Sequence, residues 1–459
     1  WAFFNGIRFP FSYTLLMHDF RYSGNQLFCE GVAVSRLAEQ FGTPLYIYSQ
    51  RTLTRHFESL DRALAPLDHR ICFAMKANSN LSVLRTLANL GSAFDVVSAG
   101  ELRRVIAAGS DPQTCVFAGV AKTDAEIEFA LQKNVYSFNV ESEAEMRRIN
   151  GIAARLNKIA PVAARVNPNV SAHTHAKITT GTYQDKFGVA FEQITGLYAR
   201  AKRLKNLHIR GLQMHIGSQM TDAGPIERAV KKILPMVRHL AGVYGLEFLS
   251  IGGGIGIVYK PALQSGSADW WKSSSANKIL TPQKYASRLV PLLQSLGLKI
   301  LIEPGRFICG NAGILVTRVE YLKRTGAKNF VIVDAAMNDL IRPAFYEAYH
   351  EIVALRRKSG PSIKADLVGG ICESGDYFAK DRLLPKVAQG DYLALLSAGA
   401  YSFAMASNYN TRPLAAEVLV NGKDVAVVRE RQPIAETWAG ERLAPWLANG
   451  RGLNGGRAN

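Results

Sequence analysis

Lys76 ends an apolar run in the stretch CFAMKANSN, residues 72–80. The run from Ile71 to Met75 predicts a buried strand, and Asn80 is a typical cap for a helix after it. A lysine at such a junction has two interpretations. It can snorkel, with its stem on apolar surface and its ammonium in water. Alternatively it lies in a pocket, where desolvation lowers its pKa and it forms an imine with a carbonyl group.

Other reactive side chains also lie where apolar runs end. They are Asp95, Arg165 and Asn167, then His215 and Ser218 in HIGSQ, Gly252, Gly253 and Gly254 in GGGIG, and Glu303, Pro304, Gly305 and Arg306 in EPGR. Each has a structural explanation by itself: a core histidine, a tight glycine turn or an internal salt bridge. Their joint placement at strand ends favours a site.

The chemistry of this set is coherent. Glycine amides wrap a phosphate without a Cβ in the way, and Ser218 adds a hydroxyl donor. The imidazole of His215 can stack on an aromatic ring, and a carboxylate such as Glu303 can keep a pyridine nitrogen protonated. With an imine-forming lysine, these are the needs of pyridoxal phosphate. The HTH stretch at 173–175 lacks a third ligand at convincing spacing, so we expect no metal.

The elements that position these residues alternate between strands and helices. Strand-like runs cover 70–76, 93–97, 115–118, 136–140, 162–166, 207–216, 246–251 and 299–303. Capping boxes are expected at Thr123 with Glu126 and at Ser142 with Glu145. Eight strands alternating with helices predict a closed parallel (β/α)8 barrel, with active-site residues at the carboxyl ends of the strands. An open doubly wound sheet is the alternative.

The sequence changes character after residue 310. Strand-like runs follow one another with few helices between them, and Asn421-Gly422 is a hairpin signal. We expect a second, mostly antiparallel β-barrel domain at 311–445, after a cofactor-binding barrel at 46–310. Residues 17–45 are expected to associate with the β domain, and the stretch at 43–49 could link or join the two. Residues 446–459 are expected to be disordered, and residues 1–16 to be a dispensable extension without signal-peptide features.

Composition narrows the class of protein. The chain has 459 residues, 48% of them apolar, and a net charge of +18. No apolar stretch approaches the roughly 20 residues that a membrane span needs. The positive charges are scattered, which argues against nucleic-acid binding and suits acidic small substrates. Five scattered cysteines favour a reducing cytosol and a cytoplasmic protein.

Longer motifs carry a family resemblance. They include FAMKANSN, GSAFDVVSAGEL, RVNPNV, GLQMHIGSQ, IGGGIGIVY, ILIEPGR, CESGDYFAKDR and GAYSFAMASNYN. From about Met17 to Glu441 the chain resembles the diaminopimelate decarboxylases, alanine-racemase-like enzymes of fold type III that use pyridoxal phosphate. Ser250, Ala336 and Met75 depart from the usual residues, but none of them removes a required group.

The resemblance implies a role for each matching residue. Lys76 is the Schiff-base lysine, His215 stacks on the ring and Glu303 faces the pyridine nitrogen. A further set binds the cofactor or the substrate: Asp95, Arg165, Ser218, Gly252, Gly253, Gly254, Pro304, Gly305, Arg306, Arg342, Tyr346, Glu373 and Tyr401. Cys372 is the proton donor, supplied with Glu373 across a homodimer interface.

The implied reaction is decarboxylation of meso-2,6-diaminopimelate to L-lysine, the last step of lysine biosynthesis. Arg306 and Arg342 can pair with the distal carboxylate, and Glu373 with the distal ammonium. The alternatives are a decarboxylase for ornithine, arginine or carboxynorspermidine, a non-catalytic homologue that binds the cofactor, and an amino-acid racemase. A racemase needs a second base, where this chain has a thiol and an acid.

Overall fold

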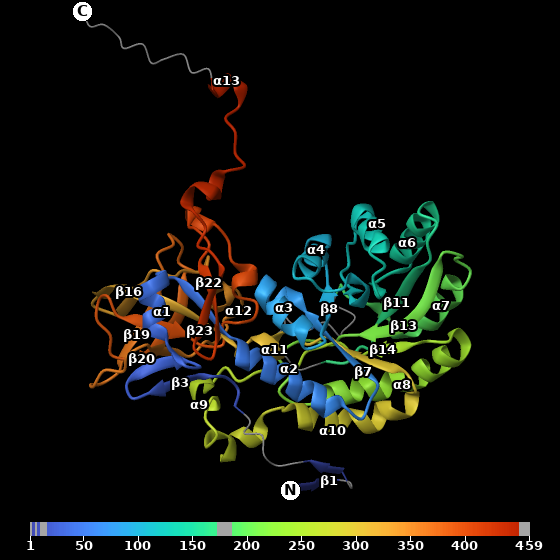
Figure 1. Cartoon of the computed structure of the whole chain (residues 1–459), viewed down its shortest axis with the longest axis horizontal. Coiled ribbons are helices and arrows are strands. Elements are labelled where there is room, and N and C mark those ends of the chain that lie inside the picture. Colours follow the sequence, from blue (N-terminus) through green and yellow to red (C-terminus); the bar gives the residue numbers. More distant parts are fainter. Residues whose placement is uncertain (1, 5–6, 10–15, 172–185, 449–459) are drawn as a thin grey trace, which may run out of the picture.

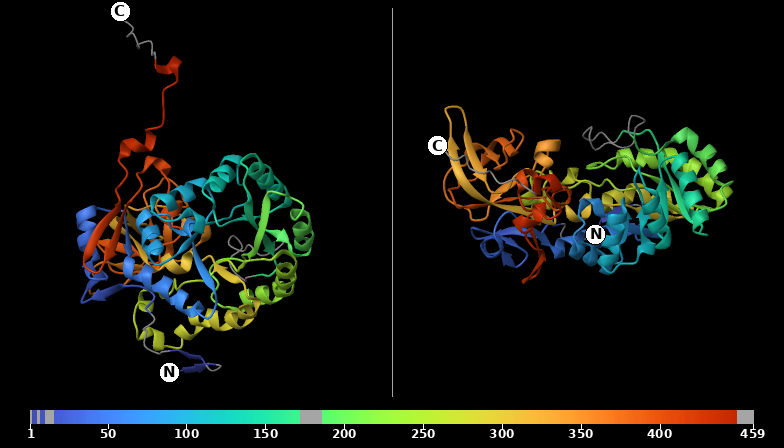
Figure 2. Two further views of the ribbon diagram at one scale, coloured as in Figure 1. Left: turned by 45° about the vertical axis from the view of Figure 1, so that its right-hand side comes forward. Right: turned by 90° about the horizontal axis from the view of Figure 1, so that it is seen from above.

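Two units lie side by side in the computed structural model, which describes residues 2–4, 7–9, 16–171 and 186–448 (Figures 1 and 2). A barrel with helices around it forms the right-hand side of Figure 1, and a mostly β unit forms the left-hand side. The HTH stretch at 173–175 and most of the N-terminal extension lie outside the described residues.

Eight strands form the barrel, and every neighbouring pair is parallel. Pairing of the fourth strand with the fifth closes the ring. The closed parallel barrel is therefore confirmed, and an open sheet is excluded. The strands are β7 (His69–Ala74), β8 (Ala93–Val96), β9 (Val116–Phe117), β10 (Ser137–Val140), β11 (Ala160–Asn167), β13 (Leu207–Met214), β14 (Phe248–Ser250) and β15 (Lys299–Ile302).

Helices cover the outside of the barrel (Figure 2). The large apolar core lies between these helices and the strands and continues into the second unit. The helices are α2 (Gln50–Leu64), α3 (Leu81–Asn89), α4 (Ala99–Ala107), α5 (Asp124–Gln132), α6 (Glu143–Arg155), α7 (Ile194–Ala201), α8 (Gly224–Tyr244) and α10 (Pro282–Leu293). The Asn80 side chain caps α3 by accepting from the Ser82 N–H.

One of the two expected capping boxes is complete. Thr123 and Glu126 exchange both bonds at the start of α5. At α6, Ser142 accepts from the Glu145 N–H, but the Glu145 carboxylate turns away. It accepts from the Glu141 N–H at 2.8 Å and from buried Lys122 Nζ at 2.6 Å. The second box is therefore wrong, because an ion pair takes the carboxylate that would have closed it.

The second unit is built on a sheet in the order β20-β19-β17-β16-β6-β22-β23, with β21 attached to β16 and β18 attached to β21. Its strands are β6 (Leu45–Ser49), β16 (Gly313–Arg324), β17 (Asn329–Val333), β18 (Ile352–Ala354), β19 (Ile363–Val368), β20 (Tyr377–Leu384), β21 (Tyr392–Leu395), β22 (Ala416–Asn421) and β23 (Asp424–Arg429). The hairpin at Asn421-Gly422 is confirmed, since Asn421 pairs with Asp424.

The chain enters this second sheet before it enters the barrel. β6 pairs antiparallel with β16 and parallel with β22, so the 43–49 stretch joins the β unit. The preceding strands β3 (Phe20–Ser23), β4 (Gln26–Cys29) and β5 (Val32–Ala33) and helix α1 (Val34–Phe41) pack there too. The second unit beside the barrel is therefore built from residues that precede the barrel in the sequence and from residues that follow it.

Candidate active site

Lys76 stands at the mouth of the barrel. β7 ends at Ala74, and a 3-10 turn, η1 (Met75–Ala77), turns the lysine over the strand ends. Its Nζ lies 3.4 Å from Asp95 Oδ2, and 44% of the side chain is exposed, into a pocket. The pocket is lined by Ala74, Lys76, Asp95, His215, Ser218, Gly254, Glu303, Gly305, Arg306 and Tyr401. Reactive residues far apart in the sequence therefore share one cavity.

The pKa of Lys76 is raised, whereas the pocket interpretation expected it to be lowered. Desolvation disfavours the ammonium, but Asp95, Tyr401 and Glu303 together raise the pKa above its ordinary value. The expectation was wrong because it considered burial and not the carboxylate beneath the amine. The free lysine is thus held as an ammonium, and it must give up a proton before it acts as a nucleophile.

Glu303 lies deep at the end of β15. Ser250 Oγ donates to its Oε1 at 2.6 Å, and Gln213 Nε2 donates to its Oε2 at 2.9 Å. Burial and the nearby Asp95 raise its pKa to about 7. Burial raises the pKa of Asp95 as well. Two desolvated carboxyl groups in one site favour a partner that carries positive charge or donates a proton.

His215 is held as a neutral imidazole. Its Nδ1 accepts from the Gly253 N–H at 3.2 Å. Burial, with Arg165 and Lys76 nearby, lowers its pKa well below the ordinary value. A neutral, half-buried ring at the pocket wall can lie against an aromatic ligand.

The glycine run is needed for close packing of backbones. A Cβ on Gly253 would lie 2.1 Å from the Glu303 carbonyl oxygen, and one on Gly254 would lie 2.4 Å from that of Gly217. Three strand ends therefore converge only because these residues lack side chains. Gly254 and Gly305 also line the pocket, where backbone amides suit an anion.

Arg306 lines the same pocket as Lys76. It donates to Ser218 Oγ, at 3.1 Å from Nη2, and to the Tyr259 hydroxyl, at 2.6 Å from Nη1. Arg342 lies over the Tyr259 ring at 5.0 Å and contacts His350 Nε2 at 2.9 Å. Burial alone would raise the Tyr259 pKa, but the two guanidinium groups lower it. Both predicted arginines therefore contact the same tyrosine, Tyr259.

Tyr259 and His350 were missed by the sequence reasoning. Tyr259 follows the glycine run in IVYK, and His350 follows the predicted Tyr346. Burial lowers the His350 pKa to about 3, so it stays neutral and contacts Arg342. The one signal in the sequence was that both residues lie close to motifs already noted. That signal does not distinguish them from the other residues near those motifs.

Tyr401 enters the pocket from the second unit. Its backbone N–H donates to the Ala77 carbonyl oxygen at 2.8 Å, and its φ is +56°. The ring lies 4.9 Å from the Arg306 guanidinium. A left-handed tyrosine is uncommon, and such residues gather at functional sites.

Several predicted residues lie outside the pocket lining. Arg165 forms a buried ion pair with Glu141 at 2.9 Å. Tyr346 ends the short helix α12 (Arg342–Tyr346) in the second unit. Cys372 and Glu373 are exposed in the loop between β19 and β20, where the Cys372 N–H donates to Asn410 Oδ1 at 3.2 Å. Within one chain the structure does not bring them to Lys76.

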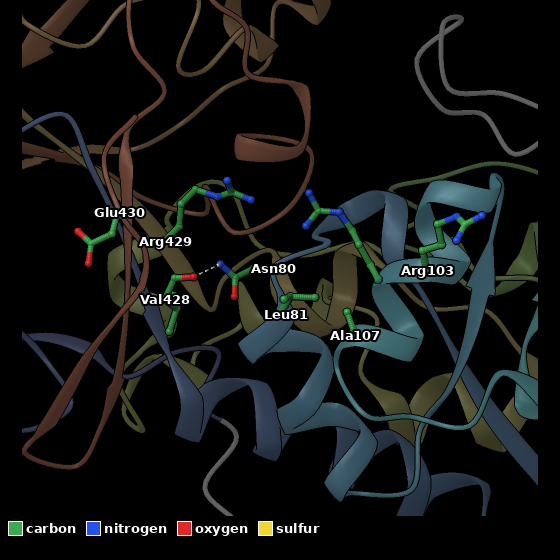
Figure 3. Close-up of a pocket in the computed structure, with 8 residues that line it drawn as sticks. Asn80, Leu81, Arg103, Ala107, Val428, Arg429 and Glu430 are labelled. Carbon is green, nitrogen blue, oxygen red and sulfur yellow. Dashed lines mark hydrogen bonds between the residues drawn. The ribbon is translucent and has the colours of Figure 1, made fainter. Parts of the chain in front are cut away.

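A larger cleft, of about 620 Å³, lies between the barrel and the second unit (Figure 3). Its arginines are held by structural partners: Arg104 donates to the Ser79 carbonyl oxygen and Arg429 to Glu417. Asn80 crosses it to the Val428 carbonyl oxygen. The Asn80 bond joins the two units, and the cleft lacks the lysine and the buried acids of the barrel mouth. The barrel mouth is therefore the candidate active site.

Two findings concern other kinds of site. Within the described part of the chain, no group of three or more His, Cys, Asp or Glu side chains could hold a metal ion. No helix there is long and apolar enough to cross a membrane.

Comparisons with known proteins agree on one family. Residues 50–310 match the family described as pyridoxal-dependent decarboxylase, pyridoxal binding domain. The chain is 46% identical to a diaminopimelate decarboxylase of Vibrio cholerae and 48% identical to one of Pseudomonas aeruginosa, each over 94% of this chain and 100% of the relative.

A solved structure shows the same likeness in three dimensions. The diaminopimelate decarboxylase of Helicobacter pylori, complexed with L-lysine, superposes with a TM-score of 0.82 at 38% identity. The match covers 88% of this chain and 98% of the other. The likeness therefore extends over both the barrel and the second unit, in structure as well as in sequence.

Proposed function

This chain belongs to the diaminopimelate decarboxylase family, and we propose that it performs that family's reaction at the barrel mouth around Lys76. It converts meso-2,6-diaminopimelate into L-lysine and carbon dioxide, the last step of lysine biosynthesis. The observation that carries the assignment of the site is the pocket in which Lys76, Asp95, Glu303 and Arg306 meet.

The described residues fit pyridoxal phosphate. Lys76 offers the amine, His215 a neutral ring face, and Glu303 a buried carboxyl for the pyridine nitrogen. Ser218, Gly254 and Gly305 line the same pocket and suit the phosphate. When bound, the cofactor supplies an electron sink for the pair released as the bond to the substrate carboxylate breaks.

The side chains manage charge during this step. Glu303, between Ser250 and Gln213, can hold its proton or its negative charge near neutral pH because its pKa lies near 7. Asp95 stabilises positive charge on the Lys76 nitrogen at 3.4 Å. Arg165, which is paired with Glu141, adds a positive charge that acts on Asp95.

Substrate choice is proposed to rest on Arg306 and Arg342. Both guanidinium groups are buried, at 6% exposure, and Tyr259 lies between them. A distal carboxylate can take forked, charge-assisted bonds from such a pair. The cationic tail of ornithine has no carboxylate to offer, and close relatives are named for diaminopimelate, so this substrate is favoured over the alternatives.

We also propose a homodimer with shared sites. Cys372 and Glu373 are exposed on the second unit and do not line the pocket of their own chain. In a dimer, Cys372 of one protomer would return a proton to the α-carbon in the site of the other, and Glu373 would meet the distal ammonium. Tyr346 is placed on the substrate side by the same proposal. Five free cysteines suit a reducing, cytoplasmic location.

One assay tests the function directly. The purified protein with pyridoxal phosphate should release equal amounts of carbon dioxide and lysine from meso-diaminopimelate, and Lys76→Ala should release neither. Faster release from ornithine or arginine, or racemisation without carbon dioxide, would contradict the assignment.

A further inference from the structure

A layer of polar side chains crosses the barrel interior just below Lys76. Inward-facing side chains of an eight-stranded barrel stack in layers of four, each layer drawn from alternate strands. Because the strands are tilted, a layer advances two residues between one alternate strand and the next. The registers therefore identify the members of each layer.

The registers connect the layer from Asp95 round to Gln213. Asp95 on β8 pairs with Val116, which pairs with Ser137 on β10. Two residues further along β10 is Asn139. Asn139 pairs with Ala163, which pairs with Gly211 on β13. Two residues further along is Gln213.

The same step closes the circle. Gln213 pairs with Ser250, which pairs with Leu301 on β15. Two residues further is Glu303, whose N–H continues the ladder to Gly252. At that level β7 presents Cys72, which pairs with Ala93, and two residues further is Asp95 again. We call Asp95, Asn139, Gln213 and Glu303 the polar ring.

The polar ring lies above an apolar filling. A separate buried cluster inside the barrel consists of Cys72, Ala93, Val116, Tyr136, Ala163, Phe248 and Leu301. Four polar side chains in one layer therefore lie directly on a dry core, which is a costly arrangement unless their polar atoms are paired.

Pairing within the polar ring is incomplete. Glu303 accepts from Gln213 and Ser250, but Asp95 Oδ1, Gln213 Oε1 and both amide atoms of Asn139 have no hydrogen-bond partner in the described residues. Asp95 and Gln213 are 2% exposed, and Asn139 is fully buried. A buried polar group left without a partner is strongly destabilising, so native proteins rarely leave several in one place.

We propose that the polar ring is a binding site for one or two ordered waters, held by Asp95 Oδ1, the Asn139 amide and Gln213 Oε1. The chemistry matches: three acceptor oxygens and one amide NH2 group lack partners, and a water donates two hydrogens and accepts hydrogen bonds. Buried waters take two to four such partners.

The waters would serve the chemistry above them. Oδ2 of Asp95 faces Lys76, and a water on Oδ1 solvates the other side, which keeps the carboxylate charged. The other charged or titratable groups that act on Asp95 or feel its charge are Arg165 on β11, Lys122 before α5, Glu303 after β15, Glu101 on α4, and the thiols of Cys72 on β7 and Cys115 before β9. Hydration of the ring therefore sustains the positive charge on the Lys76 nitrogen.

The first test is a high-resolution crystal structure of the holoenzyme. We expect a water peak within hydrogen-bond distance of the Asn139 amide and of Asp95 Oδ1 or Gln213 Oε1. In Asn139→Ala, one more water should occupy the vacated amide position. A dry ring, with the amides bonded to each other, or an empty cavity in the variant would overturn the proposal.

The second test uses stability, where a wet and a dry ring predict opposite signs. Asn139→Leu expels the water and leaves Asp95 Oδ1 and Gln213 Oε1 unpaired, so Tm should fall by roughly 3–6 °C. A rise in Tm would mean that the Asn139 amide was itself unsatisfied. Ser137→Ala is the matched control: it faces inward on the same strand, is fully buried, and should change Tm little.

The third readout concerns charge and rests on the proposed function of Lys76. In the holoenzyme, the pH midpoint of the visible absorption band should fall by about one unit in Asn139→Leu, a tenfold loss of proton affinity, and stay constant in Ser137→Ala. An unchanged midpoint would show that the waters do not affect the charge on Lys76, even if the crystal structure shows water in the polar ring. Labelling of another lysine by borohydride would contradict the cofactor assignment alone.

Discussion

At the scale of single residues, the pair formed by Lys76 and Asp95 sets the starting state of the site. A carboxylate 3.4 Å away stabilises the ammonium and raises the Lys76 pKa. The same carboxylate would stabilise a protonated nitrogen after the lysine has bonded to a carbonyl carbon. The pair therefore slows the free amine as a nucleophile and favours the charged, bonded form.

The first prediction tests that bond. Borohydride reduction of the yellow holoenzyme should fix the cofactor to the peptide that contains Lys76. Lys76→Arg keeps a cation over Asp95 but cannot form an imine, so covalent fixation should vanish and activity should fall at least about a thousandfold. Peptide mapping by mass spectrometry checks both proteins. Label on a different lysine would show that the site is assigned wrongly.

Glu303 gives a prediction about pH. Its pKa rises from 4.5 in the unfolded chain to about 7 in the folded one. The folded state then binds the proton more tightly, so this group's contribution to stability is greatest below pH 4.5 and falls as the pH rises to about 7. A shift of this size corresponds to about 3 kcal/mol.

Cofactor-free protein shows this effect without a pyridine nitrogen nearby. Between pH 4.5 and 7, the wild type should lose about 3 kcal/mol of unfolding free energy relative to Glu303→Gln, which cannot ionise. Urea unfolding across that range measures the difference. Parallel stability curves for the two proteins would contradict a raised Glu303 pKa.

At the scale of elements, the glycine run is a packing device for three strand ends. Gly253→Ala would place a Cβ 2.1 Å from the Glu303 carbonyl oxygen, so the backbone must shift. We expect a loss of about 3 kcal/mol in stability, with weaker retention of the cofactor on gel filtration.

The control is the same substitution in an open place. Gly242, in α8, is exposed and has nothing within 4 Å of an added Cβ. Gly242→Ala should stabilise by about 0.5–1 kcal/mol, because alanine favours the helix. Equal effects at the two glycines would mean that close packing does not explain the run.

Apolar runs predicted all eight barrel strands, because each run marks a buried strand whatever its neighbours are. The pairing partners of a strand were harder to predict. β6 joins the second sheet by pairing with residues more than 250 positions away, and no local sequence pattern reveals such a pairing. Glu145 was assigned to a cap because Lys122, its actual partner, lies on a loop 23 residues earlier. Tyr259 was missed for the same reason, since its role appears only when Arg306 and Arg342 meet around it.

At the scale of the whole molecule, the second unit supplies groups that the barrel lacks. Tyr401 reaches the pocket of its own chain and is fixed by its N–H bond to Ala77. Cys372 and Glu373 stay exposed on the same unit. A thiol and an acid that are exposed on the second unit, outside the pocket lining of their own chain, favour a site that two chains share.

The last prediction tests that sharing. Lys76→Ala and Cys372→Ala should each be nearly inactive as homodimers. After dissociation and random re-association, half of the dimers are mixed, and one of their two sites has both wild-type groups. The mixture should therefore recover about a quarter of wild-type activity. No recovery, with mixed dimers shown by mass spectrometry, would place Cys372 in the site of its own chain.

The Glu373→Ala enzyme should lose the preference for meso-diaminopimelate over analogues without the distal amine, because the distal ammonium then lacks its partner.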